Sequence, residues 1–553
     1  MPVEIQSLAV LNTVAFLLCV YFCAYVLSIL VLHLRTTRSP GGDHTRFDWH
    51  VIVPCRNEAT VVATTLRRLL HDMPDVTVWC VDDASEDGTG TVLHSFVADP
   101  RVRVITRRRP DAVQGKGAAL NAAWRAVQDH LPPDADLDRT IVGVLDADSY
   151  LDPRCRSALA GPRYFGNDAV AAVQIEVRMI QCARPTPGLG RWGRLLVRLQ
   201  DMEFRAPIAA MQSLRRHTRS VAMGGNGQFT RLSLLNRLGA EHGTPWHGAL
   251  LEDFELGLHI LLQGGGTEYC AESWVAQEAL TRVRPLIRQR ARWAQGSMQC
   301  GRYLASVLNS RRISNSAIME ISHFLAAPWC QLVGTPVYLG CLGVLGWYVS
   351  QTTGGVAGWW TSGGWGLLPL VALFGVGPFA VWGLVYRNRC EPHLSVTAAL
   401  GLGVGHWLYS YVQSVAVWVA LGRMLTARSE WHKTARATDP APTTAADAPA
   451  TTGVAPARVT ATRPAVTRPS PTGQAATSPS ATGQATAGQA ATGPAAAGSV
   501  LPRRAVRPAG PLVIRASVPV AQPPTQNTPM NRPHPTTTNS SDSDRKRALT
   551  CAT

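Results

Sequence analysis

Two aspartates separated by a single residue follow a short apolar run. Residues 141–145 read Ile-Val-Gly-Val-Leu and predict a buried strand, which ends at Asp146-Ala147-Asp148. Open α/β sheets bind ligands at the carboxyl ends of their strands, so the two carboxylates stand where a ligand is expected. They suit a hard divalent cation such as Mg²⁺, whose coordination substrate phosphates and water complete. The alternative is a polar turn that only closes the strand.

Polar or glycine-rich segments also follow the neighbouring predicted strands. Residues 50–54 and 76–81 read as strands, and a Gly-Lys-Gly segment opens a helix whose free N–H groups favour a phosphate. The side chains concerned are Asn57, Glu58, Asp82, Asp83 and Lys116. Strand and helix alternate over roughly a hundred residues, which predicts a mostly parallel, nucleotide-binding type of sheet. This repetition at one edge favours a ligand site over unrelated turns.

Composition and charge limit the classes of protein to which the chain can belong. The chain has 553 residues and a formal net charge of +16, much of it beside apolar segments or in the C-terminal tail. Such placement indicates a membrane surface as readily as an anionic ligand, and nothing in the sequence indicates nucleic acid. The twelve cysteines include no Cys-x-x-Cys pair, which argues against a zinc site or a disulfide framework and fits a reducing compartment.

Apolar segments flank the predicted sheet domain. Residues 8–34 contain no Asp, Glu, Lys or Arg and are long enough to span a bilayer, and the arginines that follow place the next domain in the cytoplasm. Residues 323–350, 366–386 and 394–425 are apolar enough to span as well. Basic residues lie on both sides of the last segment, and both groups favour the cytoplasm although one crossing separates them. Either that segment folds back, or an earlier segment is interfacial. We expect a cytoplasmic tail.

The domain organisation follows from these changes in composition. We expect an N-terminal transmembrane anchor at 1–38, a cytoplasmic α/β domain at 49–285, amphipathic interfacial helices at 286–322, C-terminal transmembrane helices at 323–425 and a disordered tail at 437–553. The tail is rich in Ala, Thr, Pro, Gly and Ser, so it has too few large apolar residues to offset the entropy of ordering.

Seven motifs in order resemble a known enzyme family. They read VIVPCRNE, VDDASEDGT, GKGAALN, LDADS, GGNGQFTR, LLEDFELGLHI and RQRARW, between residues 51 and 293. This series resembles the membrane-bound inverting glycosyltransferases of family 2, most closely the polysaccharide-synthase type that makes cellulose, chitin, hyaluronan or poly-N-acetylglucosamine. The resemblance implies a GT-A-type nucleotide-sugar-binding α/β domain flanked by transmembrane helices.

The resemblance assigns donor-binding roles to the sheet edge. The residues that it implies around the uridine are Pro54, Asn57, Glu58, Asp82 and Asp83. Asp82 and Asp83 have an alternative role as caps of the following turn. Lys116 would approach the nucleotide-sugar, and the alternative is that it is a solvated surface lysine. Asp146 and Asp148 match the Asp-x-Asp pair that holds Mg²⁺ or Mn²⁺ against the diphosphate.

The resemblance places acceptor chemistry in the later motifs. Gly225 and Asn226 would lie beside the acceptor sugar, although a plain tight turn explains them equally well. Asp253 matches the general base that takes a proton from the acceptor hydroxyl, so an α-linked donor would give a β-linkage. Many relatives have Thr where this chain has Leu251, which puts fine detail of the substrate in doubt.

The last motif supplies the pattern Gln-x-x-Arg-Trp. Gln289, Arg292 and Trp293 match it; Arg292 suits a diphosphate and Trp293 offers a flat face to a sugar. A basic amphipathic helix at the membrane surface accounts for the same residues, and the two interpretations are compatible. In the family this signature accompanies repeated sugar addition, so it favours a polymerase.

These observations predict a multi-pass enzyme of the cell membrane with a cytoplasmic catalytic domain. It would transfer sugar from a UDP-sugar to a nascent glycan, and an accessory export partner is possible. One alternative is a single transfer to a lipid or short acceptor. Another is a non-catalytic membrane scaffold, which the presence of Asp83, Asp146, Asp148, Asp253 and Arg292 disfavours.

Overall fold

A mixed eight-stranded sheet lies at the centre of the domain that follows the first helix. The structure is a computed structural model that describes residues 3–184 and 186–426, with side chains from residue 10 onward. The predicted disordered tail at 437–553 lies outside these residues. The strands are β1 (Asp48–Cys55), β2 (Val76–Asp83), β3 (Val102–Arg107), β4 (Thr140–Val144), β5 (Tyr150–Leu151), β6 (Val170–Met179), β7 (Gln228–Arg231) and β8 (Gly266–Gln277).

The sheet has a parallel half that brings the predicted donor residues to one edge. Its strand order is β3-β2-β1-β4-β7-β6-β8-β5, and the first four strands are parallel neighbours. Cys55 pairs with Asp82 and Ile52 pairs with Val144, so the polar segments that follow β1, β2 and β4 begin at nearly the same level. The predicted α/β sheet is confirmed, with β7 antiparallel to both of its neighbours.

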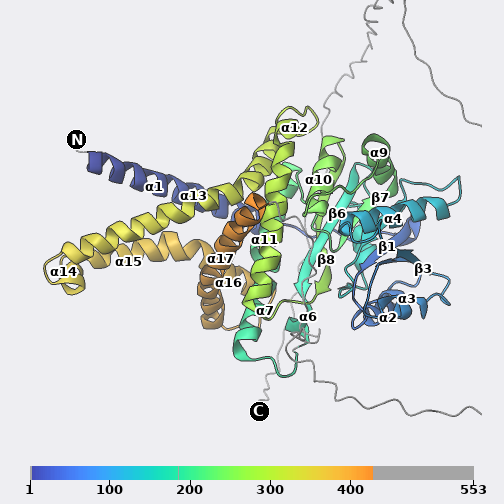
Figure 1. Cartoon of the computed structure of the whole chain (residues 1–553), viewed down its shortest axis with the longest axis horizontal. Helices are drawn as coiled ribbons and strands as arrows, with labels where there is room; N and C mark the ends of the chain where they lie inside the picture. The colour runs from blue at the N-terminus through green and yellow to red at the C-terminus, as the bar shows by residue number, and fades with distance from the viewer. Residues whose placement is uncertain (1–2, 185, 427–553) are drawn as a thin grey trace, which may run out of the picture. The chain divides into compact units, whose positions relative to one another are not determined.

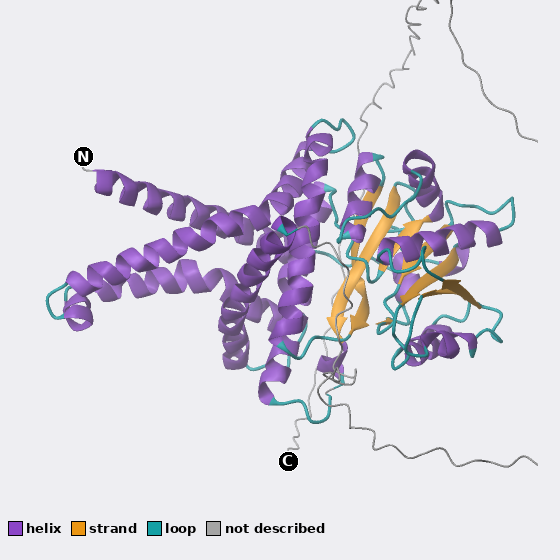
Figure 2. Ribbon diagram, viewed as in Figure 1, coloured by secondary structure: helices purple, strands orange, loops and turns teal. Residues whose placement is uncertain are grey.

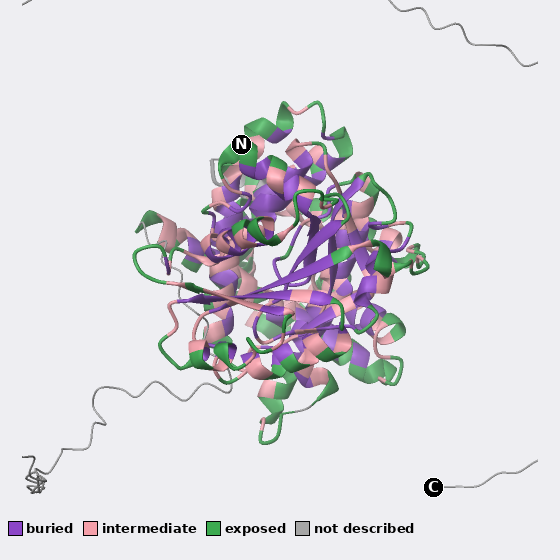
Figure 3. Ribbon diagram, turned by 90° about the vertical axis from the view of Figure 1, so that its right-hand side faces the viewer, coloured by how far each residue is buried: buried purple, intermediate pink, exposed green. Residues whose placement is uncertain are grey.

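Helices cover both faces of the sheet (Figure 2). On one face lie α2 (Val62–Asp72), α3 (Thr89–His94) and α5 (Cys155–Leu159); on the other lie α4 (Lys116–His130), α9 (Leu232–His242) and α10 (Glu252–Leu262). Because strand side chains alternate, Val51 and Val53 pack into the first layer and Ile52 into the second. The strands are accordingly buried between exposed loops (Figure 3). This rigid sheet holds the edge residues in place.

Three helical segments are long and apolar enough to cross a bilayer. They are α1 (Val3–Leu34), α13 (Asn315–Gln351), and the run from Gly364 to Arg389 that contains α15 (Leu367–Leu370), a π-helical turn (Val371–Val376) and α16 (Gly377–Arg389). Large apolar side chains such as Phe16 and Leu339 are 66% and 63% exposed, a surface that suits lipid better than water. The predicted span in α17 (Val396–Leu425) is not among these three segments and stays a prediction.

An apolar cluster joins these helices to the sheet domain. The middle of the chain forms α6 (Ile180–Ala183), α7 (Arg191–Glu203), a π-helical turn (Phe204–Ile208) and α8 (Ala209–Thr218). Leu199 and Met202 of α7 pack with Ile29 of α1, Tyr386 of α16 and Leu402 of α17. The remaining helices, all after the sheet, are α11 (Val283–Cys300), α12 (Leu304–Leu308) and α14 (Gly355–Thr361), and α11 runs beside α17 (Figure 1).

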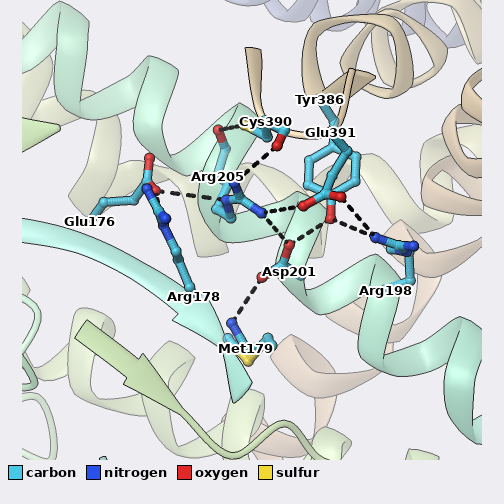
Figure 4. A network of polar contacts seen from close by, with 9 residues as sticks. All are labelled: Glu176, Arg178, Met179, Arg198, Asp201, Arg205, Tyr386, Cys390 and Glu391. Carbon is cyan, nitrogen blue, oxygen red and sulfur yellow. Dashed lines mark hydrogen bonds and ion pairs between the residues drawn. The ribbon is translucent and has the colours of Figure 1, made fainter. Parts of the chain in front are cut away.

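A buried polar network strengthens the same junction (Figure 4). Asp201 of α7, whose side chain is 1% exposed, accepts hydrogen bonds from the backbone N–H of Met179 at 2.8 Å, the Tyr386 hydroxyl at 2.5 Å and Arg205 Nη1 at 3.0 Å. Arg205 also contacts Glu391, just beyond α16, at 2.9 Å. Buried charges are costly unless paired, so the network fixes the end of α16 to the sheet domain. None of the seven motifs described above includes Asp201.

Candidate active site

The turn after β1 is shaped by Asn57. Its φ is +56°, a left-handed conformation that asparagine tolerates, and its side-chain oxygen accepts a hydrogen bond of 2.8 Å from the backbone N–H of Glu86. This bond ties the turn to the loop after β2. Pro54 and Glu58, on either side, line a cavity at the edge of the sheet. Of these three predicted residues, Asn57 therefore shapes the turn and the other two face the cavity.

The two aspartates at the end of β2 have different surroundings. Asp82 accepts a hydrogen bond from the backbone N–H of Ser85 at 3.1 Å, which is the capping role considered as an alternative. Asp83 lines the cavity, forms an ion pair with Arg107 and accepts a hydrogen bond from the backbone N–H of Val113 at 3.1 Å. Both side chains are buried, and of the two residues Asp83 alone is among those that line the cavity.

Lys116 lies at the first position of α4 and points to the Asp-x-Asp pair. Its Nζ donates a hydrogen bond of 2.6 Å to Oδ1 of Asp146. Burial alone would lower the pKa of Lys116, but the carboxylates of Asp146 and Glu252 raise it by more, so the amine stays protonated. Lys116 is therefore a fixed positive charge inside the site and not a solvated surface lysine.

The Asp-x-Asp pair has the ligand types that Mg²⁺ or Mn²⁺ accepts. Asp146 and Asp148 both line the cavity, and the side chain of Asp146 is 35% exposed. Within the described ranges, no group of three or more acidic, histidine or cysteine side chains is placed to hold a metal ion. Magnesium is often held by one or two carboxylates together with substrate phosphates. The pair thus fits a cation that arrives with the donor diphosphate.

The glycine-rich loop before β7 is packed between this pair and α10. Asn226 accepts a hydrogen bond from the backbone N–H of Asp146 at 3.1 Å and donates to Ser149 Oγ and Gln277 Oε1, each at 2.9 Å. Gly225 has a φ of +74°, and a Cβ added there would lie 2.7 Å from Oδ2 of Asp253. The loop is therefore more than a plain turn: Asn226 positions the Asp-x-Asp segment, and Gly225 allows the close approach to Asp253.

Asp253 lies in the first turn of α10 and lines the cavity. Its Oδ1 accepts a hydrogen bond of 2.7 Å from the backbone N–H of Phe254. Burial, followed by the negative charge of Glu252, raises the pKa of Asp253 to about 7, although Lys116 acts in the opposite direction. A carboxylate with such a pKa can accept a proton near neutral pH. The helix dipole favours acids at this position in any case, but it does not explain the cavity around this one.

The Gln-x-x-Arg-Trp motif lies on α11 and faces the cavity. Gln289, Arg292 and Trp293 all line it. The guanidinium of Arg290 lies 4.1 Å from the centre of the Trp293 ring, so it covers part of this aromatic surface. Arg284 and Arg288 are exposed on the same helix, which agrees with the alternative of a basic amphipathic helix. Both interpretations of α11 stay predictions.

One cavity of about 530 Å³ connects these groups to the apolar helices. The end that we call the donor end, after the predicted roles of its residues, contains Asp83, Lys116, Asp146, Asp148 and Arg292. Beyond Asp253, the lining continues with Phe254, Phe324 and Pro328 and reaches Val417 of α17. A ligand in this cavity can thus place a polar group at Asp253 and an apolar portion against α13 and α17.

The structure brings together most of the predicted site residues and adds others. Those lining the cavity are Pro54, Glu58, Asp83, Lys116, Asp146, Asp148, Asn226, Asp253, Gln289, Arg292 and Trp293. Arg56, Glu252 and Glu278 also line it, and each stands within a motif or at the end of a strand, a position that could have indicated it. Arg215 lines it too, from the interior of α8, where no sequence signal marks it.

Comparisons with known proteins bear on the region that contains the sheet. Residues 48–296 match the family model described as "Glycosyltransferase like family 2". A "Beta-monoglucosyldiacylglycerol synthase" of Trichormus variabilis is 26% identical over 258 residues, which are 46% of this chain and 49% of that protein. The protein of the same name from Synechocystis is 27% identical over 259 residues, 46% of this chain and 48% of the relative. The chain thus spans about half the length of these relatives.

Two further similarities are more limited. An "Undecaprenyl-phosphate mannosyltransferase" of Micrococcus luteus is 41% identical over 75 residues, 13% of this chain and 30% of that protein. Among solved structures, the mannosyltransferase PcManGT of Pyrobaculum calidifontis, in complex with GDP-Man and Mn²⁺, has a TM-score of 0.48 and 16% identity over 76% of this chain and all of its own. By the family model, residues 48–296, which are less than half of the chain, are similar to the glycosyltransferases of family 2.

Proposed function

We propose that the protein is a membrane-bound glycosyltransferase that transfers one sugar from a UDP-sugar to the hydroxyl group of a lipid, with inversion. The observation that supports this most is the continuity of the cavity. The same space contains Asp146 and Asp253 and, beyond them, Phe324 and Val417 of the apolar helices. An acceptor that joins a hydroxyl group to hydrocarbon chains matches a cavity that is polar at one end and apolar at the other.

The donor end would hold the nucleotide and its diphosphate. Asp83, Pro54 and Glu58 line the part next to β1 and β2, where the nucleoside would bind. Asp146 and Asp148 would hold Mg²⁺ or Mn²⁺, which when bound supplies positive charge to the departing diphosphate. Lys116 adds a protein-borne positive charge at the same place, and Arg292 would contact the diphosphate with its forked donors.

Asp253 would act as the base. It takes the proton from the acceptor hydroxyl while that oxygen attacks the anomeric carbon; the bond to the diphosphate oxygen breaks, and UDP leaves with the electron pair. Direct displacement with a single base inverts the anomeric centre, so an α-linked donor gives a β-linked product. Gly225 keeps the space beside Asp253 Oδ2 free of a side chain.

The names of the relatives support a lipid acceptor. Two of them refer to synthesis of glucosyldiacylglycerol, and a third refers to undecaprenyl phosphate. Under this proposal residues 1–38 and 323–425 contribute the membrane anchor and helices, and the catalytic domain faces the cytoplasm. Residues 286–322 then form the interface, where α11 lies between the catalytic domain and α17.

A second candidate is the extension of a polysaccharide. It is favoured by Trp293, which lines the cavity and offers an aromatic surface to a nascent glycan. An accessory export partner would be needed only in this case. Product size separates the two candidates.

The test is turnover by the purified full-length protein across a panel of nucleotide-sugars, with Mg²⁺ or Mn²⁺ and a lipid extract. We expect release of UDP with one donor, and loss of that release in EDTA and in Asp253→Asn. Transferred sugar should be extractable with lipid at one sugar per acceptor. Turnover that gives a water-soluble polymer would support the second candidate, and no turnover with any donor would contradict both.

A further inference from the structure

The membrane end of the cavity contains two arginines whose charges are already balanced. We call this part the membrane-side lining; its members include Met211, Arg215, Arg290, Phe324, Gln413 and Val417. The other positively charged side chains that line the cavity are Arg56, Lys116 and Arg292. Lys116 contacts Asp146, and the positive charge of Arg292 acts on Glu252. The charge that a lipid meets beyond Asp253 therefore depends on Arg215 and Arg290.

Arg215 is neutralised by a buried glutamate of α13. Its Nε donates a hydrogen bond of 3.0 Å to Oε1 of Glu320, and both residues are only 5% exposed. The hydroxyl of Tyr25 donates to the same carboxylate at 3.1 Å. The guanidinium lies 4.8 Å from the centre of the Phe324 ring. This pair therefore presents donors and an aromatic face, but no net charge.

Arg290 is neutralised in the same way from α7. Its Nη2 donates a hydrogen bond of 2.5 Å to Oε2 of Glu203, and the two residues are 2% and 8% exposed. Glu203 also accepts hydrogen bonds from the Tyr409 hydroxyl at 2.8 Å and from Gln413 Nε2 at 2.9 Å. Its carboxylate is thus held by three donors from α11 and α17, and the second pair is also neutral.

This balance opposes an acceptor that carries a phosphate next to its chains. A phosphomonoester has a charge of about −1.5 to −2 at neutral pH. Placed beside two paired arginines it would leave that charge uncompensated in a largely apolar space, or it would have to displace Glu203 or Glu320 and leave a buried carboxylate unpaired. Either result is unfavourable, because a buried charge without a partner is costly. An uncharged acceptor meets neither cost.

The neutral pairs still offer hydrogen-bond donors. Nη2 of Arg215, and Nε and Nη1 of Arg290, are buried and have no hydrogen-bond partner among the residues that the structure describes, and the same holds for Oγ of Ser297. Ester carbonyl or hydroxyl oxygens are acceptors that satisfy N–H groups without adding charge. We propose, on the basis of the lipid-acceptor function above, that the membrane-side lining selects an uncharged glyceride-type alcohol through the balanced pairs Arg215–Glu320 and Arg290–Glu203.

A matched pair of probe lipids tests this inference directly. Dioleoylglycerol and dioleoylphosphatidate have the same chains and differ by the phosphate alone. Each would compete with a fluorescent diacylglycerol for the purified full-length protein in uncharged detergent. We expect dioleoylglycerol to compete at least about tenfold better, because the phosphatidate brings an uncompensated charge. Equal or better competition by the phosphatidate, or no competition by either lipid, would overturn the inference.

Two isosteric variants then assign the selection to the pairs. Glu320→Gln and Glu203→Gln each leave one arginine with an unbalanced positive charge, so the preference for dioleoylglycerol should fall by at least about tenfold. Glu268→Gln is the control, since Glu268 pairs with Arg216 at 3.3 Å and is not among the lining residues. UDP binding reports whether each variant is folded. An unchanged preference in both folded variants would contradict the assignment.

Labelled transfer separates failure of this inference from failure of the proposed function. Sugar transferred to a polyprenyl phosphate and not to dioleoylglycerol would overturn the uncharged acceptor, while a lipid acceptor would stand. Sugar transferred only to water-soluble glycan would overturn both.

Discussion

The two ends of the cavity are built in different ways. At the donor end, Asp83 and Asp146 stand at the carboxyl ends of parallel strands, and Asp253 stands in the first turn of a helix. At the membrane end, side chains come from the interiors of α8, α11, α13 and α17, between residues 211 and 417. The donor end is thus a product of sheet topology, whereas the membrane end is a product of helix packing.

The ends also differ in how their charges are balanced. The donor end concentrates Asp83, Asp146, Asp148, Glu252 and Asp253 around few cations, an arrangement that suits a metal ion and a proton transfer. The membrane end pairs each arginine with a glutamate. Under the proposed function, this difference assigns the chemistry to the donor end and the selection of the acceptor to the membrane end.

The largest expected effect is at the base. Asp253→Asn removes the proton acceptor while it keeps the shape of the side chain, so kcat should fall about a thousandfold. The measurement is UDP release at saturating donor, and Asp134→Asn, at an exposed position, is the control. A loss of less than tenfold would mean that another group accepts the proton.

The next effect concerns the attachment of the helices. Asp201→Asn removes a buried charge that accepts three hydrogen bonds, and we expect it to lower the free energy of unfolding by about 3 kcal/mol. The midpoint of thermal unfolding in detergent would fall accordingly. Asp168→Asn, at an exposed position, should leave the midpoint unchanged. Equal midpoints for the two variants would show that the network in Figure 4 does not hold α16 in place.

Removal of divalent cations tests the donor end alone. Chelation with EDTA should lower turnover at least about a hundredfold, because the departing diphosphate loses several kcal/mol of charge stabilisation. Binding of dioleoylglycerol should not change, since the membrane-side lining contains no predicted metal ligand. Turnover that survives EDTA would leave Lys116 and Arg292 as the groups that balance the diphosphate.

A larger side chain in the membrane-side lining tests the other end. Val417→Trp fills space against α13, so we expect KM for the lipid acceptor to rise about thirtyfold, within the range for steric changes in apolar pockets. KM for the nucleotide-sugar should change less than about twofold, because the donor end is untouched. Val419→Trp, on the same helix at a position 40% exposed, is the matched control. Equal changes in both constants would mean that the ends do not act separately.

The smallest effect is the dependence on pH. Because the pKa of Asp253 is raised to about 7, the carboxylate is active above that pH and is lost as the pH falls through it. At pH 6, kcat/KM should be about tenfold below its plateau, since kcat/KM reports groups of the free enzyme. A profile flat from pH 5.5 to pH 8 would contradict the raised pKa.

The sequence predicts the donor end better than the membrane end for a physical reason. Polar residues such as Asp83, Asp146 and Lys116 interrupt apolar runs where strands end or helices begin, so local pattern reveals them. Arg215 and Glu203 lie within helices, where charged residues are ordinary, and their partners Glu320 and Arg290 are 105 and 87 residues away along the chain. Only packing brings such residues together. The same limit explains why the role of Asp82 as a turn cap, and not a cavity residue, needed the structure.

The most direct measurement of the central claim is the fate of a labelled sugar. Purified full-length protein would be incubated with its labelled nucleotide-sugar, a divalent cation and dioleoylglycerol, and the products would be separated by extraction and sized. The account predicts label in the organic phase, with one sugar per lipid, and none in a parallel reaction with Asp253→Asn. Label that remains in a water-soluble polymer would contradict it.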